Sequence, residues 1–456
     1  MTLADRDSPL AIAMWDFSWL ERRYPGGGYE DWNRALDELV ERGYDAVRID
    51  AYPHLVSTGP DREWTLPPAF DACEWGAPAT CRVEVTPALT EFIGACADRG
   101  VSVALSSWFR EDETRARMGI RTPADLAAVW VDTLDRIADA GLLDTLCWVD
   151  LCNEFPLHQW APYFNDPDEP RTPRDSPAGR RWINDAIAGV RAAYPDQEYC
   201  LSETVGPDVW GREPAAEMDL LEPHIWLMNA TDYYDWERDG GDIDSAEHYE
   251  WVVEHAAERY REEPDRWRAA LGDAIDAAAE WSRETGLPLA TTESWALIHY
   301  KDWPGLDWAW LKEVCAFGTR RAAETGRWSA ISTSNFCGPQ FEGMWADVEW
   351  HREVTDAIED ESGAGQIYEI GGPETLTLRD VTEMVYESEG KSVKIVPLPM
   401  ALAGIGLTTL GVLPGFPMDR DQYHGLKVSN ISENDVDHFD IDESELRTFG
   451  DYLGLS

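Results

Sequence analysis

Short apolar segments alternate with amphipathic segments along residues 10–360 of the chain. Eight apolar segments have the length and composition of buried strands: residues 11–17, 44–49, 101–107, 146–153, 199–203, 224–228, 289–293 and 329–335. Stretches with helical periodicity lie between or after them, at residues 32–42, 87–99, 124–140, 181–193, 215–221, 265–285, 308–325 and 347–359. A repeated strand–helix order predicts a parallel sheet covered by helices, and eight repeats predict a closed (β/α)₈ TIM barrel.

In a barrel of this kind, functional groups gather at the carboxyl ends of the strands. The residues at the predicted ends are mostly acidic, aromatic or amide-bearing, whereas a purely structural end would carry more Ser, Gly and Pro. They are Asp16, Arg48 with Asp50, Trp108, Asn153 with Glu154, Glu203, His224 with Trp226, Glu293 with Trp295, and Asn335. We therefore expect a functional site at this face.

Glu154 and Glu293 are expected at the ends of the fourth and seventh strands. Glycoside hydrolysis needs two carboxyl groups beside the scissile bond, a protonated acid for the leaving oxygen and an ionised group for the anomeric carbon. Two strand ends in these positions place two carboxyl groups across a shared pocket. The two side chains could also be structural acids of the barrel. Asp150 is expected to be a hydrogen-bonding acid inside the barrel rather than a catalytic residue.

Several strand ends together resemble a known family. The segment 148–155, Trp-Val-Asp-Leu-Cys-Asn-Glu-Phe, resembles the acid/base strand of the clan of (β/α)₈ retaining glycosidases that includes cellulases, mannanases and β-galactosidases. The segment 291–295, Thr-Thr-Glu-Ser-Trp, is similar to the nucleophile strand of that clan. The segment 224–226, His-Ile-Trp, is similar to its His-x-Tyr, and Arg48 matches an Arg beside the nucleophile. The resemblance covers residues 10–360.

This resemblance implies a role for each matching residue. Glu154 would be the acid/base, Glu293 the nucleophile, and Asn153 would bind the sugar 2-hydroxyl. Arg48 is expected to lower the pKa of Glu293, while a less compensated environment keeps Glu154 protonated. His224 would belong to the same substrate site, although a histidine at this place is as often a satisfied core residue. The mechanism requires neither a metal nor an organic cofactor.

The sequence departs from the clan at three strand ends. Phe155 stands where Pro is usual, residues 106–108 lack the histidine of the third strand, and residues 333–335 replace the tryptophan of the eighth. These departures leave the sugar and the linkage open.

Tryptophan is abundant, with 23 residues in the chain. Indole rings stack on the apolar faces of sugars and donate hydrogen bonds to hydroxyl groups. Trp15, Trp108, Trp226 and Trp295 are therefore candidate sugar platforms, and Glu203 is a candidate for a further substrate contact. Trp160, Trp210 and Trp303 lie in predicted loops and are expected to shape more distant parts of the site. Packing between barrel and helices is the alternative role for about half of the tryptophans.

The charge balance restricts the partners. Asp and Glu number 87 against 38 Lys and Arg, which gives a formal net charge of −49. Such a surface repels nucleic acids and anionic lipids, so we expect a carbohydrate partner and no nucleic acid. Dispersed acids with few lysines are typical of a halophilic, cytoplasmic protein. We expect no signal peptide, no disulfide scaffold and no membrane span, since the apolar run at residues 400–416 is interrupted by glycine and proline.

The pattern changes after the Ser-Gly-Ala-Gly linker at residues 362–365. Residues 365–379, followed by Val-Pro-Leu-Pro at residues 396–399, resemble the C-terminal substrate part of atypical short-chain dehydrogenases of the NAD-dependent epimerase type. The nucleotide-binding half of that family has no counterpart, so we do not expect NAD binding. The sequence predicts two domains, a barrel at residues 1–360 and a small α/β module at residues 365–456. In the module we expect strands at residues 366–370 and 393–396 and a helix at residues 378–389.

The main prediction is a retaining glycosidase that hydrolyses a β-glycosidic bond in an oligo- or polysaccharide. Three alternatives remain open. The first is a sugar-binding barrel without catalysis. The second is a metal-dependent sugar isomerase with Glu154, Glu203, His224 and Glu293 as ligands. The third is a dehydrogenase-related binding protein that acts through the C-terminal module.

Overall fold

The computed structural model describes most of the first 361 residues and a few later segments. The described residues are 3, 6, 8–69, 76–166, 168, 170–204, 217–227, 245–297, 307–361, 376–388, 390–394, 448, 450 and 453. The chain divides into two compact units, Met1–Gly365 and Gln366–Ser456.

A parallel sheet forms the centre of the first unit. Its strands are β7 (Tyr199–Cys200), β6 (Leu146–Asp150), β5 (Ser102–Ser106), β2 (Ala46–Asp50), β1 (Leu10–Asp16), β11 (Trp328–Ser332) and β9 (Leu289–Thr291), in this spatial order. Every neighbouring pair in this order is parallel. Consecutive strands of this sheet are therefore joined by crossover connections, as a repeated strand–helix order requires.

A short segment connects the two outer strands of this sheet. The backbone N–H of Glu203, just after β7, donates to the carbonyl of Glu222, and the N–H of Ala290 in β9 donates to the carbonyl of Leu221. Residues 225–226 then form β8 (Ile225–Trp226), which pairs in parallel with β10 (Ser294–Trp295). Residues 221–226 thus lie between β7 and β9, and the curled sheet fits an α/β barrel.

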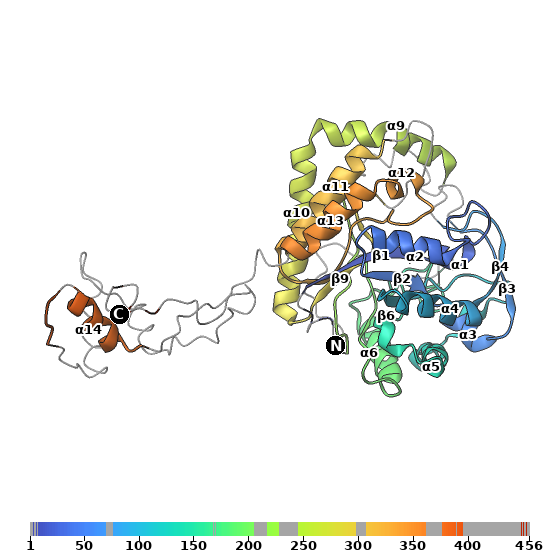
Figure 1. Cartoon of the computed structure of the whole chain (residues 1–456). Coiled ribbons are helices and arrows are strands. Elements are labelled where there is room, and N and C mark those ends of the chain that lie inside the picture. The colour runs from blue at the N-terminus through green and yellow to red at the C-terminus, as the bar shows by residue number, and fades with distance from the viewer. Residues whose placement is uncertain are drawn as a thin grey trace. The chain divides into compact units, whose positions relative to one another are not determined.

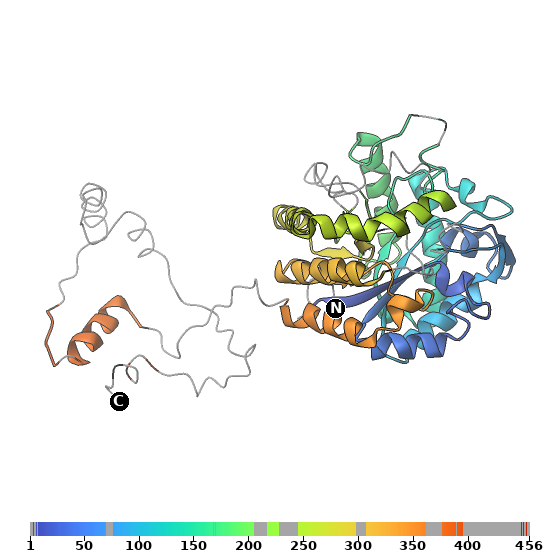
Figure 2. The same ribbon diagram turned by 90° about the horizontal axis from the view of Figure 1, so that it is seen from above.

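Helices surround the strands of the first unit (Figures 1 and 2). The longer ones are α2 (Trp32–Glu41), α4 (Val85–Ala97), α5 (Pro123–Asp139), α6 (Pro177–Arg191), α9 (Ala246–Glu262), α10 (Pro264–Thr285), α11 (Ala309–Glu324) and α13 (Val348–Glu361). Shorter turns are α1 (Ser18–Glu21), α3 (Pro53–Thr58), η3 (Ala116–Gly119), η4 (Leu143–Thr145) and α12 (Glu342–Trp345).

Local sequence explains where these helices begin and end. Thr122 and Asp125 form a reciprocal capping box at the start of α5, with Pro123 in the first turn. Gly286 ends α10 with a φ of 75°, a left-handed conformation that glycine adopts without strain. Signals of this kind are local, which is why the helices expected from periodicity lie close to the observed ones.

Three elements differ from the sequence prediction. Residues 50–85, expected as a loop, contain an antiparallel hairpin of β3 (Glu63–Leu66) and β4 (Cys81–Glu84). Residues 229–264, also expected as a loop, include α9. The helix expected at residues 215–221 is wrong over residues 217–221, because Leu221 pairs with the strand at Leu289 instead. Tertiary pairing overrides the weak helical preference there.

The second unit is described mainly through α14 (Leu378–Ser388), which confirms the helix expected at residues 378–389. Thr377 caps it, since its hydroxyl accepts from the backbone N–H of Asp380 while the carboxylate of Asp380 accepts from Thr377. The strand expected at residues 366–370 and the apolar run at residues 400–416 lie outside the described residues.

The described cysteines, Cys81, Cys96, Cys147, Cys152, Cys200, Cys315 and Cys337, are all free thiols. Cys73, the possible partner of Cys81, lies outside the described residues. No described helix has the length and apolar character needed to cross a membrane.

Candidate active site

Two glutamates and a histidine meet at the carboxyl ends of the strands. Nδ1 of His224 lies 3.0 Å from Oε1 of Glu154 and 3.7 Å from Oε2 of Glu293. One oxygen of each glutamate and a ring nitrogen of His224 lie within 4.8 Å of one another. All three residues are buried, with Glu154 8% and Glu293 4% exposed. The structure therefore brings the predicted acid pair together around His224.

Glu154 follows β6 in an unusual backbone conformation. Its φ is 47°, in the left-handed region that residues other than glycine seldom adopt. Its backbone N–H donates to Oγ of Ser202 at 2.9 Å, and Nε1 of Trp160 donates to its Oε2 at 3.3 Å. Residues held in such conformations by their surroundings concentrate at functional sites. Trp160, expected to shape a distant part of the site, instead contacts the acid directly.

Glu293 follows β9 and lies against two cationic groups. Nη1 of Arg48 donates to its Oε1 at 3.2 Å, and His224 is its other close neighbour. Burial raises the pKa of Glu293 to about 7, although His224 and Arg48 act to lower it. Arg48 acts in the expected direction, but the pKa of Glu293 is nevertheless raised. Desolvation of a carboxylate outweighs the nearby charges.

Arg48, on β2, is completely buried and contacts groups from several strands. Its Nη2 lies 2.5 Å from Oδ2 of Asp150 and 2.8 Å from Oδ1 of Asn153. Its guanidinium lies over the ring of Trp108, with the central carbon 4.6 Å from the ring centre. Because Oδ1 of Asn153 accepts from Arg48, Nδ2 of Asn153 is left without a hydrogen-bond partner among the described residues. That donor can serve a ligand hydroxyl.

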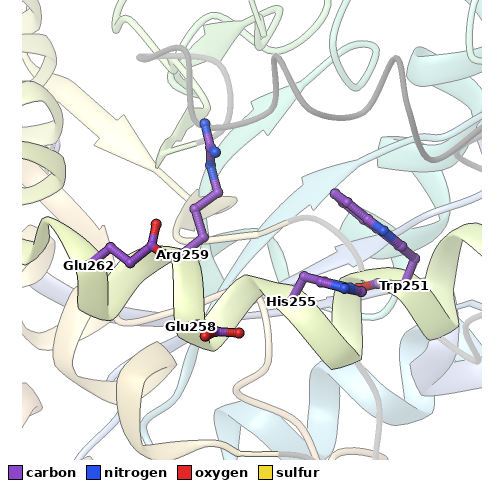
Figure 3. A pocket seen from close by; sticks show the side chains of 5 residues that line it. All are labelled: Trp251, His255, Glu258, Arg259 and Glu262. Carbon is purple, nitrogen blue, oxygen red and sulfur yellow. The ribbon is translucent and has the colours of Figure 1, made fainter.

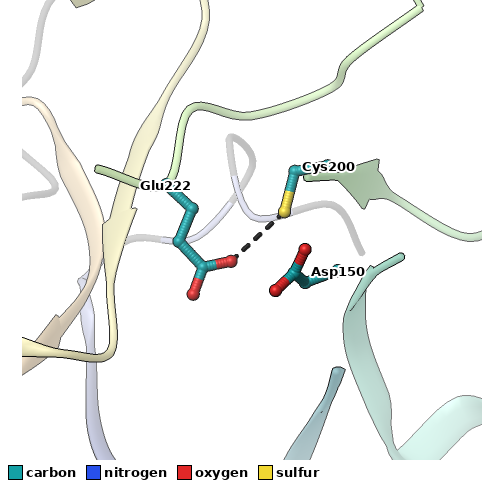
Figure 4. Close-up of side chains that lie close together, drawn as sticks. All are labelled: Asp150, Cys200 and Glu222. Carbon is teal, nitrogen blue, oxygen red and sulfur yellow. Dashed lines mark hydrogen bonds between the residues drawn. The ribbon is translucent and has the colours of Figure 1, made fainter. Parts of the chain in front are cut away.

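A group of buried acids lies around Arg48 deeper in the barrel. Asp150 comes from β6, Cys200 from β7 and Glu222 from the segment before β8, and their side chains point toward one another (Figure 4). Asp150 accepts from Arg48 and from the hydroxyls of Ser106 and Ser202, which confirms its predicted role as a hydrogen-bonding acid inside the barrel. Sequence reasoning missed Glu222, because it lies between the helix predicted at residues 215–221 and the strand predicted at residues 224–228. Its position two residues before His224, on the same side of an extended strand, was the available signal.

The four candidate tryptophans separate into two groups. Trp15 donates from Nε1 to the carbonyl of Cys337 and packs against Tyr29 and Phe92. Trp295 donates to the carbonyl of Ser332 and packs against Trp328. Both rings are fully buried in side-chain packing, so the structure does not bring them to the acid pair as sugar platforms.

Trp108 and Trp226 have a different environment. Each is fully buried, and its Nε1 has no hydrogen-bond partner within the described part of the chain. Trp108 covers Arg48, and Trp226 lies two residues beyond His224, on the same side of the strand. An indole N–H without a partner is costly in a dry site, so these two are the better candidates for ligand contacts. Trp210 and Trp303 lie outside the described residues.

Glu203, at the end of β7, is also buried beside the acid pair. Its Oε2 lies 3.6 Å from Nε of Arg174, and its backbone carbonyl accepts from the N–H of His224. Burial raises the pKa of Glu203, while Arg174 and His224 act to lower it. The side chain therefore belongs to the electrostatic surroundings of His224.

Two clusters have the composition of a metal site. They are Glu154, His224 and Glu293, and Asp150, Cys200 and Glu222, each with ligand atoms within 4.8 Å of one another. Arg48 contacts a member of both clusters, since it bonds Glu293 and Asp150. A fixed guanidinium in those positions repels a second cation, and Glu203 is not part of either cluster. The arrangement is therefore a poor match for the isomerase alternative.

A surface pocket lies along α9, and none of its lining residues belongs to the candidate active site. It is lined by Trp251, His255, Glu258, Arg259 and Glu262, which follow one side of the helix (Figure 3). The ring of Trp251 stacks on His255, with 4.7 Å between ring centres. All of its lining residues come from one helix, whereas the residues of the candidate active site come from several strand ends.

Comparisons with known proteins identify the family of the first unit. The family of sugar-binding cellulase-like proteins matches residues 12–359. A crystal structure of a Parabacteroides distasonis protein, provisionally described as a glycoside hydrolase, is 43% identical, with a TM-score of 0.74; the alignment covers 78% of this chain and 94% of that one. No protein among the curated ones matches the sequence.

More distant structures include Cel5A of Thermotoga maritima in complex with cellobiose, in a mutant form. It is 15% identical, with a TM-score of 0.46 and coverage of 77% of this chain and 96% of that one, which is too distant to inform the activity. The matches confirm the resemblance of residues 10–360 to cellulase-like proteins. The family match ends before residue 366, and no comparison supports the dehydrogenase-like resemblance of the second unit.

Proposed function

The chain belongs to the family of sugar-binding cellulase-like proteins, and from this membership and its acid pair we propose that it is a retaining β-glycosidase. The substrate would be an oligo- or polysaccharide with a β-glycosidic bond.

The separation of the two glutamates carries this proposal. A pair of their carboxyl oxygens lies within 4.8 Å. Retaining glycosidases keep their two carboxyl groups about 5–5.5 Å apart, whereas inverting ones need about 6.5–9.5 Å to admit a water molecule. The short separation favours direct attack by one carboxylate over attack by an activated water.

In the proposed mechanism Glu293 is ionised and Glu154 carries the proton. Burial and the charge of Glu154 raise the pKa of Glu293, whereas the hydrogen bond from Arg48 favours the negative charge on Glu293. Glu293 attacks the anomeric carbon while Glu154 protonates the leaving oxygen, which gives a glycosyl-enzyme. Glu154 then removes a proton from water as the intermediate is hydrolysed. Nδ2 of Asn153 donates to the sugar 2-hydroxyl.

Covalent trapping tests the proposal. A 2-deoxy-2-fluoro β-glycoside with an activated leaving group should inactivate the protein and add one glycosyl unit to the peptide that contains Glu293, as found by mass spectrometry. A label on another residue, or turnover of natural substrates with inverted configuration by NMR, would contradict the retaining mechanism. Activity abolished by a chelator and restored by Mn²⁺ or Mg²⁺ would favour the isomerase alternative.

A sugar-binding protein without turnover is the second candidate, because the family as a whole is described by sugar binding. Calorimetric titration with oligosaccharides separates it from the first. Binding without any hydrolysis, with affinity unchanged in Glu293→Gln, would favour this candidate.

A further inference from the structure

Glu222 lies close to Arg48 and His224, which both contact the acid pair. Its side chain is completely buried. Oε1 of Glu222 lies 3.5 Å from Nε of Arg48 and 4.0 Å from Nε2 of His224. Arg48 and His224 are the two groups that contact Glu293. Glu222 is thus connected to the proposed nucleophile and acid without touching either.

The carboxyl group of Glu222 accepts three hydrogen bonds. Nε1 of Trp148 donates to its Oε2 at 3.0 Å, Sγ of Cys200 donates to the same oxygen at 3.2 Å, and Oγ1 of Thr292 donates to Oε1 at 2.7 Å. An ionised carboxylate accepts only, and three donors converge on this one. The donors come from three different strand segments, so the carboxylate is fixed in position by the barrel itself.

The two nitrogens of His224 face different acids. Nδ1 faces Glu154 and Glu293, whereas Nε2 faces Glu222 and has no hydrogen-bond partner among the described residues. The other charged groups around the ring are Arg48 and Glu203. If neutral His224 carried its proton on Nδ1, the lone pair of Nε2 would point toward the fixed charge of Glu222. A proton on Nε2 removes that repulsion.

We propose that Glu222 is a positioning residue that holds a proton on Nε2 of His224 and thereby leaves Nδ1 to exchange a proton with Glu154. When the proton is on Glu154, Nδ1 accepts the hydrogen bond from its carboxyl group. When the proton has moved to His224, Nδ1 donates to the Glu154 carboxylate. The proton reaches the leaving-group oxygen from Oε1 or Oε2 of Glu154 while the glycosidic C–O bond breaks and a carboxylate oxygen of Glu293 bonds the anomeric carbon. The part that concerns hydrolysis rests on the proposed glycosidase function.

Nitrogen-15 NMR of the histidine side chains tests the tautomer without any substrate. The resonances of His224 are identified by their loss in His224→Gln. In the unchanged protein we expect a protonated Nε2 at every pH at which the ring is neutral. Glu222→Gln should move a measurable fraction of the ring to the Nδ1-protonated form. Asp150→Asn is the matched control, since it removes a buried acid that contacts Arg48 and should leave the tautomer of His224 unchanged.

A protonated Nδ1 in the unchanged protein would overturn the proposal even if Glu222→Gln does not fold. An unaltered His224 spectrum in a folded Glu222→Gln would overturn it as well.

Hydrolysis of two substrates separates an effect on Glu154 from an effect on Glu293. The dinitrophenolate group of a dinitrophenyl glycoside departs without a proton, whereas the alkoxide group of an alkyl glycoside needs a proton from Glu154. Glu222→Gln should slow the alkyl glycoside about 10- to 100-fold and the dinitrophenyl glycoside less than about threefold. Equal losses would show that Glu222 acts through Arg48 and Glu293 instead, and would overturn the assignment to the acid. If the unchanged protein hydrolyses neither glycoside, the proposed function fails while the NMR result still decides the tautomer.

Discussion

Nη1 of Arg48 donates to Oε1 of Glu293 at 3.2 Å, and both side chains are buried inside the barrel. The guanidinium opposes the rise in the pKa of Glu293 that burial causes. This contact joins residues 245 positions apart in the sequence. The same contact therefore affects both the pKa of the proposed nucleophile and the free energy of unfolding.

Arg48→Lys should impair both properties. A lysine ammonium cannot reproduce the fork that reaches Glu293 and Asp150, so we expect a loss of about 2 kcal/mol or more in the free energy of unfolding. Weaker stabilisation of the Glu293 carboxylate should also move the acidic limb of kcat/KM to higher pH. Urea unfolding and a pH–rate profile measure these effects. Arg62→Lys, at an exposed ion pair with Glu113, is the control and should change neither by more than the error of the measurement. An unshifted acidic limb would contradict the assigned role of Arg48.

Glu154→Gln should affect substrates unequally. It removes the proton donor but leaves Glu293 in place, so alkyl glycosides should lose about 10²–10⁴-fold in kcat/KM, which reports formation of the glycosyl-enzyme, and activated aryl glycosides much less. Glu293→Gln removes the nucleophile and should abolish hydrolysis of both. Glu284→Gln, at an exposed position of α10, is the control and should keep full activity. Equal losses for both substrate types in Glu154→Gln would contradict its role as the acid/base.

His351 should make the fold sensitive to acid. Its Nδ1 lies 2.8 Å from the hydroxyl of Tyr44, and its Nε2 lies 3.1 Å from the carbonyl of Met344, so the neutral ring is satisfied at both nitrogens. Burial, with a smaller effect of Arg42, lowers the pKa of His351 to about 3. The unfolded chain therefore binds a proton below pH 6.5 that the folded one refuses until about pH 3. Stability from this residue is complete above that unfolded pKa and is lost as the pH falls toward 3.

Removing this histidine should reduce that pH dependence. His351→Gln is expected to lower the free energy of unfolding at neutral pH, because packing is lost, but to flatten its decline between neutral pH and about pH 4. Urea unfolding at several pH values measures the slope. His255→Gln, at an exposed site on α9, should leave the slope unchanged. An equally steep decline in His351→Gln would mean that other groups cause the acid sensitivity.

The net charge predicts that salt stabilises the fold. With −49 charges the folded chain repels itself, and added ions screen that repulsion. We expect the melting temperature to rise from about 0.1 M to about 2 M KCl, with most of the electrostatic gain at the lower concentrations. Sucrose at the same osmolality provides a comparison without ionic screening. A melting temperature independent of KCl would contradict adaptation to salt.

Removal of the second unit should leave the proposed activity intact. The family match ends at residue 359, and the first compact unit ends at Gly365. A chain that stops at Gly365 should keep kcat/KM within about twofold, because domains of this kind hold their own cores. Hydrolysis assays on both chains make the comparison. A complete loss of function with a folded barrel would favour the alternative in which the second unit carries the function.

The strand–helix order could be predicted from sequence because its signals are local. Apolar runs, capping residues and glycines mark each element within a few positions. Seven of the eight predicted strand segments contain strands of the seven-stranded sheet, and the eighth, residues 224–228, contains β8, which pairs with β10. The same local signals placed Glu154 and Glu293 after β6 and β9. The hairpin of β3 and β4 was missed because its strands are short and stable only against the rest of the unit.

The direction of each side chain was decided by tertiary structure. Trp15 and Trp226 both end apolar strand segments, yet only Trp226 leaves an unpaired indole N–H beside His224. Register and bulges determine which face of a strand a residue occupies, and neither can be seen in one strand alone. The environment of Glu222 likewise depends on donors from three distant segments. The sequence by itself therefore determined which residues reach the carboxyl end of the barrel, whereas packing between distant strands decided which of them share protons and charge.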